Sequence, residues 1–170
     1  ALTDAIRWFL MATAARWARG QKNKHSSMLI HTSMLTSDHD ELESLAKVEL
    51  RDLKNQFERG DTGSWREQWE VESQRVQAHD FGLSPVSFEE VANELQDVLN
   101  TTEISVDNGS SDSRLDYNEG PQTVIAIGGN TLSRGLTLEG LVSSYFVRRA
   151  SAYDTLPVSY THLRAHETKA

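Results

Sequence analysis

Glycine, serine and arginine follow one short apolar run, and together they have the chemistry of an anion site. The run 123–127 leads into Gly128-Gly129-Asn130 and then Ser133-Arg134-Gly135. Glycines at a strand end let backbone N–H groups approach an anion closely, and a helix starting just afterwards adds a favourable partial charge. The guanidinium of Arg134 is planar and permanently charged, which suits phosphate. The residue types fit a phosphate-contacting loop, but taken alone Gly-Gly after a strand more often marks only a tight turn.

The spacing of these glycines differs from the two common nucleotide-binding patterns. The dinucleotide fingerprint G-x-G-x-x-G is absent, and so is the P-loop pattern G-x-x-x-x-G-K-[ST]. A Rossmann-like nucleotide-binding domain therefore stays a weaker alternative for this chain.

Hydrophobic periodicity predicts the elements that would position this loop. Helical spacing extends over about 2–19, 37–59, 64–77 and 87–99, and short strand-like runs cover 27–32, 103–107, 123–127 and 141–147. Ser87 and Glu90 have the spacing of a capping box. Strands separated by helices predict an α/β fold with a parallel sheet and helices on both faces. Ligands bind such sheets at the carboxyl ends of the strands, where the glycines would lie.

Composition bounds the function further. The chain has no cysteine, which excludes disulfides, thiolate catalysis and cysteine-bound metals. The net charge of −8 argues against strong independent binding of nucleic acid, although a few contacts within a larger basic assembly remain compatible with it. No apolar run reaches the roughly 18 residues that a membrane span needs, and no signal peptide is visible. We expect no membrane association and a cytoplasmic protein.

Several other side chains have a structural reading beside a functional one. The acidic run 38–41 is typical of a helix start, so no metal site is predicted there. Trp65 and Trp69, four residues apart, are more typical of packing than of base stacking. His31 ends a predicted strand, where packing or capping competes with contact to a nucleotide or RNA. Arg148 follows another strand end and faces either phosphate or solvent.

The segment 125–141, I-A-I-G-G-N-T-L-S-R-G-L-T-L-E-G-L, resembles the signature of the Z1 domain family, to which endonuclease activity has been ascribed. Four further segments follow the family pattern in the expected order, at 26–33, 116–117, 145–148 and 153–156. The family is similar to the second RecA-like domain of superfamily-two helicases. The resemblance therefore implies a RecA-like domain of the P-loop NTPase type, in which 28–33 matches helicase motif four and 129–137 matches motif five.

The resemblance also implies roles for particular residues. Nucleotide binding would fall to Gly128, Gly129, Asn130, Ser133, Arg134 and Gly135, and coupling to nucleic acid would fall to His31, Thr32, Ser33 and Arg148. The acidic residue usual two positions after the Arg-Gly pair is replaced by Thr137, which puts a ribose contact there in doubt. Catalytic residues are not expected in this chain, because the arginine-finger motif would follow residue 156.

Both ends of the chain carry expectations of their own. A helical pattern begins at Ala1 without an initiator methionine, and residues 158–168 match the translation of a common transposase-based sequencing adapter. We expect residues 1–157 to be a partial Z1 domain, incomplete at both ends, with a helical insertion at about 38–100. Residues 158–170 are expected to be a non-native tail.

For the longer protein, the resemblance implies ATP and Mg²⁺ as cofactors, nucleic acid (with DNA favoured) as partner, a first RecA-like domain, and a role in anti-phage or restriction-type defence. The chain alone is expected to be inactive. A nuclease motif of the Glu-x-Lys type occurs only at 167–169, within the expected tail. The second hypothesis is a RecA-like scaffold or interaction module without catalysis, which the acidic charge and Thr137 favour.

Overall fold

Four parallel strands form one sheet in the computed structural model, which describes residues 1–32, 36–106, 120–129 and 138–147. The strands are β1 (Ser26–His31), β2 (Thr102–Val106), β3 (Thr123–Gly128) and β4 (Leu141–Phe146). Their order is β2-β3-β1-β4, and all three neighbouring pairs are parallel. The predicted α/β fold with a parallel sheet is thereby confirmed, and each strand lies within a residue or so of its predicted position.

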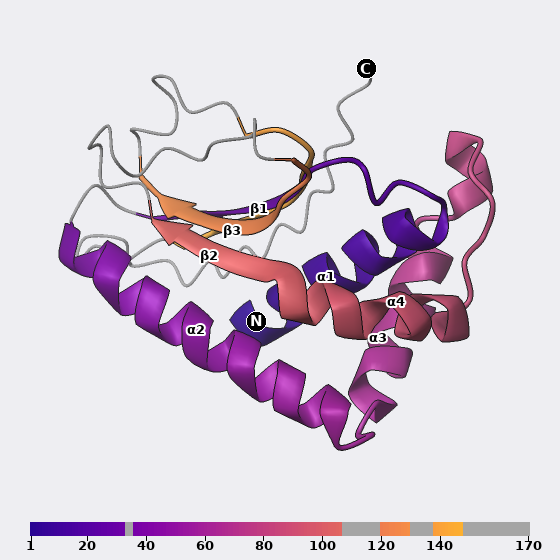
Figure 1. The fold of residues 1–170 in the computed structure, drawn as a ribbon, viewed down its shortest axis with the longest axis horizontal. Coiled ribbons are helices and arrows are strands. Elements are labelled where there is room, and N and C mark those ends of the chain that lie inside the picture. Colours follow the sequence, from indigo (N-terminus) through magenta and orange to yellow (C-terminus); the bar gives the residue numbers. More distant parts are fainter. Residues whose placement is uncertain (33–35, 107–119, 130–137, 148–170) are drawn as a thin grey trace, which may run out of the picture.

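In the described residues, four α-helices and one short 3-10 helix accompany the sheet. They are α1 (Leu2–Ala18), α2 (Thr36–Glu58), α3 (Gly63–Arg75), η1 (Ala78–Phe81) and α4 (Phe88–Thr101). All of these described helices lie on one face of the sheet (Figure 1). The β2–β3 and β3–β4 connections fall largely outside the described residues, so the expectation of helices on both faces stays a prediction. For α2, α3 and α4 the shared face follows from connectivity, because all three belong to the single crossover between β1 and β2.

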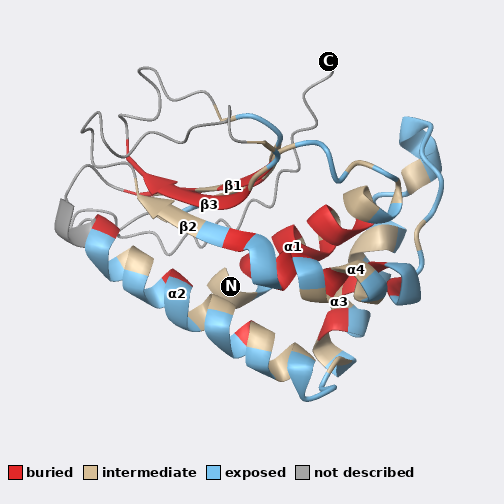
Figure 2. Ribbon diagram, in the orientation of Figure 1, coloured by how far each residue is buried: buried red, intermediate tan, exposed pale blue. Residues whose placement is uncertain are grey.

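The core lies between that face and the helices. Side chains alternate along a strand, so the register places Met28 beside Ile125 and Ile30 beside Ile127, pointing toward the helices. All four side chains are fully buried. Every residue of β3 is buried and β1 nearly so (Figure 2), as expected for central parallel strands with continuous apolar runs.

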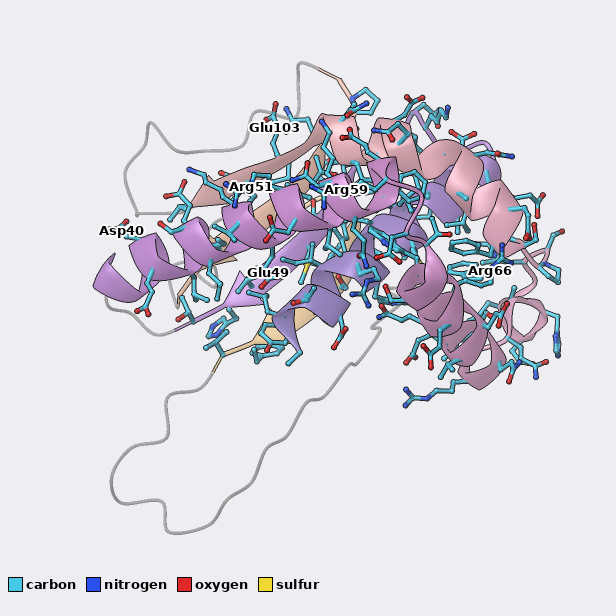
Figure 3. All side chains as sticks on the ribbon, turned by 90° about the horizontal axis from the view of Figure 1, so that it is seen from below. Asp40, Glu49, Arg51, Arg59, Arg66 and Glu103 are labelled. Carbon is cyan, nitrogen blue, oxygen red and sulfur yellow. The ribbon has the colours of Figure 1, made fainter. Side chains whose placement is uncertain are left out.

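Helix α3 is anchored by its two tryptophans, as the packing interpretation predicts. Trp65 is fully buried and Trp69 is 8% exposed. The indole N–H of Trp69 donates to the carbonyl oxygen of Val86 at 3.2 Å, and its ring lies 5.7 Å from that of Trp8 in α1. Arg66, on the same helix, bonds to Glu89 of α4 at 2.8 Å (Figure 3). These contacts hold α3 against α1 and α4, so the tryptophans are not free to stack on bases.

The acidic run 38–41 lies in the first turns of α2, which continues with charges of both signs (Asp40, Glu49, Arg51 and, just past its end, Arg59; Figure 3). Within the described ranges, no three His, Cys, Asp or Glu side chains converge as a metal site would require. None of the described helices has the length and apolar character needed to cross a bilayer.

Helix α4 begins at the predicted capping box. The Ser87 hydroxyl accepts from the N–H of Glu90 at 3.2 Å, and the Glu90 carboxylate accepts from the N–H of Ser87 at 2.8 Å. Replacing Ser87 by alanine should lower the free energy of unfolding by about 1 kcal/mol, measured by urea denaturation. The matched control is Ser73→Ala, because Ser73 is a helical serine whose hydroxyl bonds only to Glu70 of its own turn. Equal losses in the two variants would contradict the assigned cap.

A hydrogen-bonded cluster joins the amino ends of β1, β3 and β4. Nη1 of Arg16 donates to the carbonyl oxygen of His25 at 2.8 Å and to the Ser26 hydroxyl at 2.7 Å, and burial lowers the pKa of this arginine below its ordinary value. Nδ1 of His25 accepts from the N–H of Gln122 at 3.1 Å, ahead of β3. The Ser27 N–H donates to the carbonyl of Gly140 at 2.9 Å, ahead of β4. The His25 side chain and the Ser27 backbone thus fix where β3 and β4 begin, and Arg16 of α1 holds the start of β1.

Candidate functional site

The carboxyl ends of β3, β1 and β4 form the edge where a parallel sheet binds ligands. Register places Gly128, His31 and Phe146 side by side in one row across these strands. The ladder continues one residue further, because the N–H of Thr32 donates to Gly128 at 3.0 Å and the N–H of Val147 donates to His31 at 2.8 Å. The strand ends are therefore held in a fixed relation up to the start of the predicted loop.

Four residues singled out from the sequence meet at this edge. Gly128 and Gly129 are buried, Thr32 is 5% exposed and His31 is half-buried. Side-chain alternation puts Thr32 toward the helices and His31 toward the opposite face. The two predicted strands 27–32 and 123–127 therefore end at the same edge of the sheet.

The other six candidates lie outside the described residues. They are Ser33, Asn130, Ser133, Arg134, Gly135 and Arg148. The phosphate contacts expected of them therefore stay predictions.

The described part of the edge consists mainly of backbone groups and aromatic rings. Among Thr32, Gly128, Gly129, Phe146 and Val147 no side chain titrates, and His31 is the one ionisable group beside them in this described set. Such an edge can contact a ligand through backbone N–H groups and aromatic faces. Positive charge for a phosphate would have to come from Arg134 or Arg148, the cations that follow β3 and β4 in the sequence.

Phe146 is a residue of this edge to which sequence reasoning gave no role. Its side chain is 61% exposed, and its ring lies 5.3 Å from that of His31, tilted by 38°. The sequence signal was an apolar run ending in Tyr145-Phe146-Val147, which predicts a strand but does not tell which of its aromatic residues faces water. The register with β1 supplies that information.

A separate hollow of about 440 Å³ lies at the opposite, amino edge of the sheet. Its lining includes Lys22, Lys24 and Glu103. Lys22 is already paired, because its ammonium bonds to Glu94 at 2.6 Å. This hydrogen bond raises the pKa of Lys22 above its ordinary value. The hollow holds none of the residues singled out from the sequence as ligand contacts, so the candidate site is the carboxyl edge.

A four-stranded, all-parallel sheet with flanking helices is consistent with an α/β fold of the RecA-like kind. The sequence model of the Z1 domain matches residues 1–158, nearly the whole chain. The chain belongs to the Z1 domain family. Neither the curated proteins nor the solved structures give a match.

Proposed function

We propose that this chain acts as the second motor domain of a helicase-like, ATP-dependent protein that works on nucleic acid. In this role the carboxyl edge of the sheet forms one wall of the ATP cleft and links it to the nucleic-acid groove. The observation that supports the proposal best is the position of Gly128 and Gly129. They end the buried central strand β3 directly beside the end of β1, where the backbone can approach a phosphate.

The residues at this edge determine which contacts to ATP the chain would supply and which would come from the first RecA-like domain. Backbone groups near Gly129 and the guanidinium of Arg134 would orient the phosphates of ATP. The described edge offers no carboxylate, so the Mg²⁺ that accompanies ATP would be held by the first RecA-like domain. Hydrolysis needs the metal, the phosphate-binding lysine and an arginine finger positioned together. Since this chain supplies only one wall, we expect it to bind ATP weakly and not to hydrolyse it.

Endonuclease activity, ascribed to the family, would then belong to a longer protein. In the described residues no acidic cluster of the kind that holds a catalytic metal is present. A scaffold module without catalysis is the second candidate, and the net charge of −8 favours it, because an acidic domain repels the nucleic acid that a motor must grip.

Titration with ATP and Mg²⁺, followed in the amide NMR spectrum, tests the proposal. The Gly128 and Gly129 amides should shift, and Arg134→Ala should weaken the apparent affinity about tenfold, the usual worth of a charge-assisted hydrogen bond. Lys24→Ala, which removes a cation at the opposite edge, is the matched control and should leave the affinity unchanged.

Two results would count against this function. If saturating ATP shifts only amides around the amino-edge hollow, the nucleotide site is misplaced. If the purified chain turns over ATP above the rate of Arg134→Ala, the chain is a complete catalyst and not one wall of a cleft. No shift at any amide would favour the scaffold.

A further inference from the structure

Two aromatic rings from neighbouring strands stand together on the candidate edge. His31 ends β1 and Phe146 ends β4, and the two residues are partners in the parallel register. Their ring centroids are 5.3 Å apart and the planes are tilted by 38°. The Val147 N–H bonds to the His31 carbonyl at 2.8 Å, immediately beyond Phe146. This bond holds the ends of β1 and β4 beside each other.

The ring pair lies on the face of the sheet that the described helices leave uncovered. Ile30 and Tyr145, one residue earlier in each strand, pack against the core between sheet and helices. Side-chain alternation therefore turns His31 and Phe146 to the opposite face. Phe146 is the most exposed large apolar side chain among the described residues, at 61%.

Gly128 completes this row on the other side of His31. Gly128 is buried and adds no side chain to the row. Across β3, β1 and β4, the row thus consists of the Gly128 backbone, the His31 imidazole and the Phe146 phenyl ring. The exposed ring of Phe146 offers a face for a planar group, and the predicted phosphate-contacting loop follows Gly128 in the sequence.

We propose that His31 and Phe146 form a platform on which an unstacked base of single-stranded nucleic acid stacks. This inference rests on the proposed function for the presence of nucleic acid, and it adds the contacted group and strand form. Base–aromatic stacking tolerates any base sequence, because every base has a π-face. It also needs little positive charge at the platform, which fits an acidic chain. Bases within a duplex are already stacked on their neighbours, so a duplex would not stack on the rings of His31 and Phe146.

Photocrosslinking to a short single strand that carries halogenated uracil bases is the direct test, since it also captures weak complexes. The crosslink should map to the peptides that contain His31 and Phe146. Phe146→Leu keeps the apolar bulk but removes the ring, and should lower the crosslink yield at limiting protein about tenfold, within the range of stacking energies. Phe146→Tyr keeps the ring and should retain the yield.

Phe81→Leu is the matched control, because Phe81 is 51% exposed in η1, away from the strand ends. It should leave the crosslink unchanged. Far-ultraviolet circular dichroism should show that all three variants are folded, as expected for substitutions of exposed side chains. A duplex of the same sequence should compete poorly, and a free nucleotide that competes as well as the strand would reassign the stacked base to a mononucleotide.

The remaining outcomes separate this inference from the proposed function. Crosslinks that map elsewhere and survive Phe146→Leu would overturn the platform while leaving nucleic-acid binding in place. If no crosslink forms with any strand, the platform fails together with the nucleic-acid part of the function. ATP-dependent shifts at Gly128 and Gly129 would still be informative in that case, because they report on the nucleotide wall alone.

Discussion

Replacing Gly140 by alanine should lower the free energy of unfolding by roughly 3 kcal/mol or more. Gly140 has a φ of +65°, a left-handed conformation that costs an L-residue about 1–2 kcal/mol. A Cβ here would also overlap the carbonyl oxygen of His25 and lie 2.6 Å from its carbonyl carbon. That carbonyl cannot move freely, because it accepts a hydrogen bond from Arg16. The strand pair β1–β4 would have to separate at its start.

Gly20→Ala isolates the clash from the backbone strain. Gly20 also has a positive φ, +82°, but nothing lies within 4 Å of the position its Cβ would take. We expect it to cost about 1 kcal/mol. Both variants are compared by urea denaturation followed by circular dichroism. Equal losses would show that the contact between Gly140 and His25 does not matter for stability.

Truncating Trp65 to alanine should cost about 3–5 kcal/mol, the usual range for a fully buried large aromatic side chain. Its ring packs edge-on against Phe57 of α2, with centroids 5.8 Å apart, and the guanidinium of Arg7 lies 5.8 Å from the ring. Its indole N–H donates to Gln56 at 3.2 Å. One side chain therefore joins α3 to both α1 and α2, and its loss leaves a cavity and an unpaired amide oxygen.

Two comparison variants make the Trp65 prediction sharp. Trp65→Phe keeps a ring in the core but loses the hydrogen bond to Gln56, so it should cost about 1–2 kcal/mol. Val71→Ala, at a half-exposed position of the same helix, should change the free energy of unfolding by about 0.5 kcal/mol or less. Urea denaturation measures all three. A loss for Trp65→Ala as small as that for Val71→Ala would mean that α3 does not contribute to the cooperative core.

Local patterns in the sequence were enough for the elements but not for their arrangement. The capping box and the apolar spacing of 91, 95, 98 and 99 predicted α4 closely, because both are interactions within one helix. The strand order depends on pairings between distant segments: Gln122 bonds to His25, 97 residues away. No periodicity reports such a pairing, and none told which face the helices cover.

The candidate site divides in the same way. A glycine pair after a buried apolar run could be placed at a carboxyl strand end from sequence, since that rule is local. The exposed position of Phe146 could not be predicted in this way, because it depends on β4 pairing with β1 in a particular register. Gly140 was likewise invisible as a special position, because the carbonyl that crowds it belongs to His25, more than a hundred residues earlier.

The strand order also sets a sequence of events in synthesis. β3 separates β1 from β2 in the sheet, yet it leaves the ribosome after both. Residues 1–106 contain two strands that cannot pair with each other in the native order, so the nascent chain must hold the apolar side chains of β1 against its helices alone. Only when residues 123–128 emerge can the sheet close. Pairing over such distances is slow, and the waiting intermediate is prone to aggregate. The order of the strands in the sheet thus differs from the order in which they are synthesised.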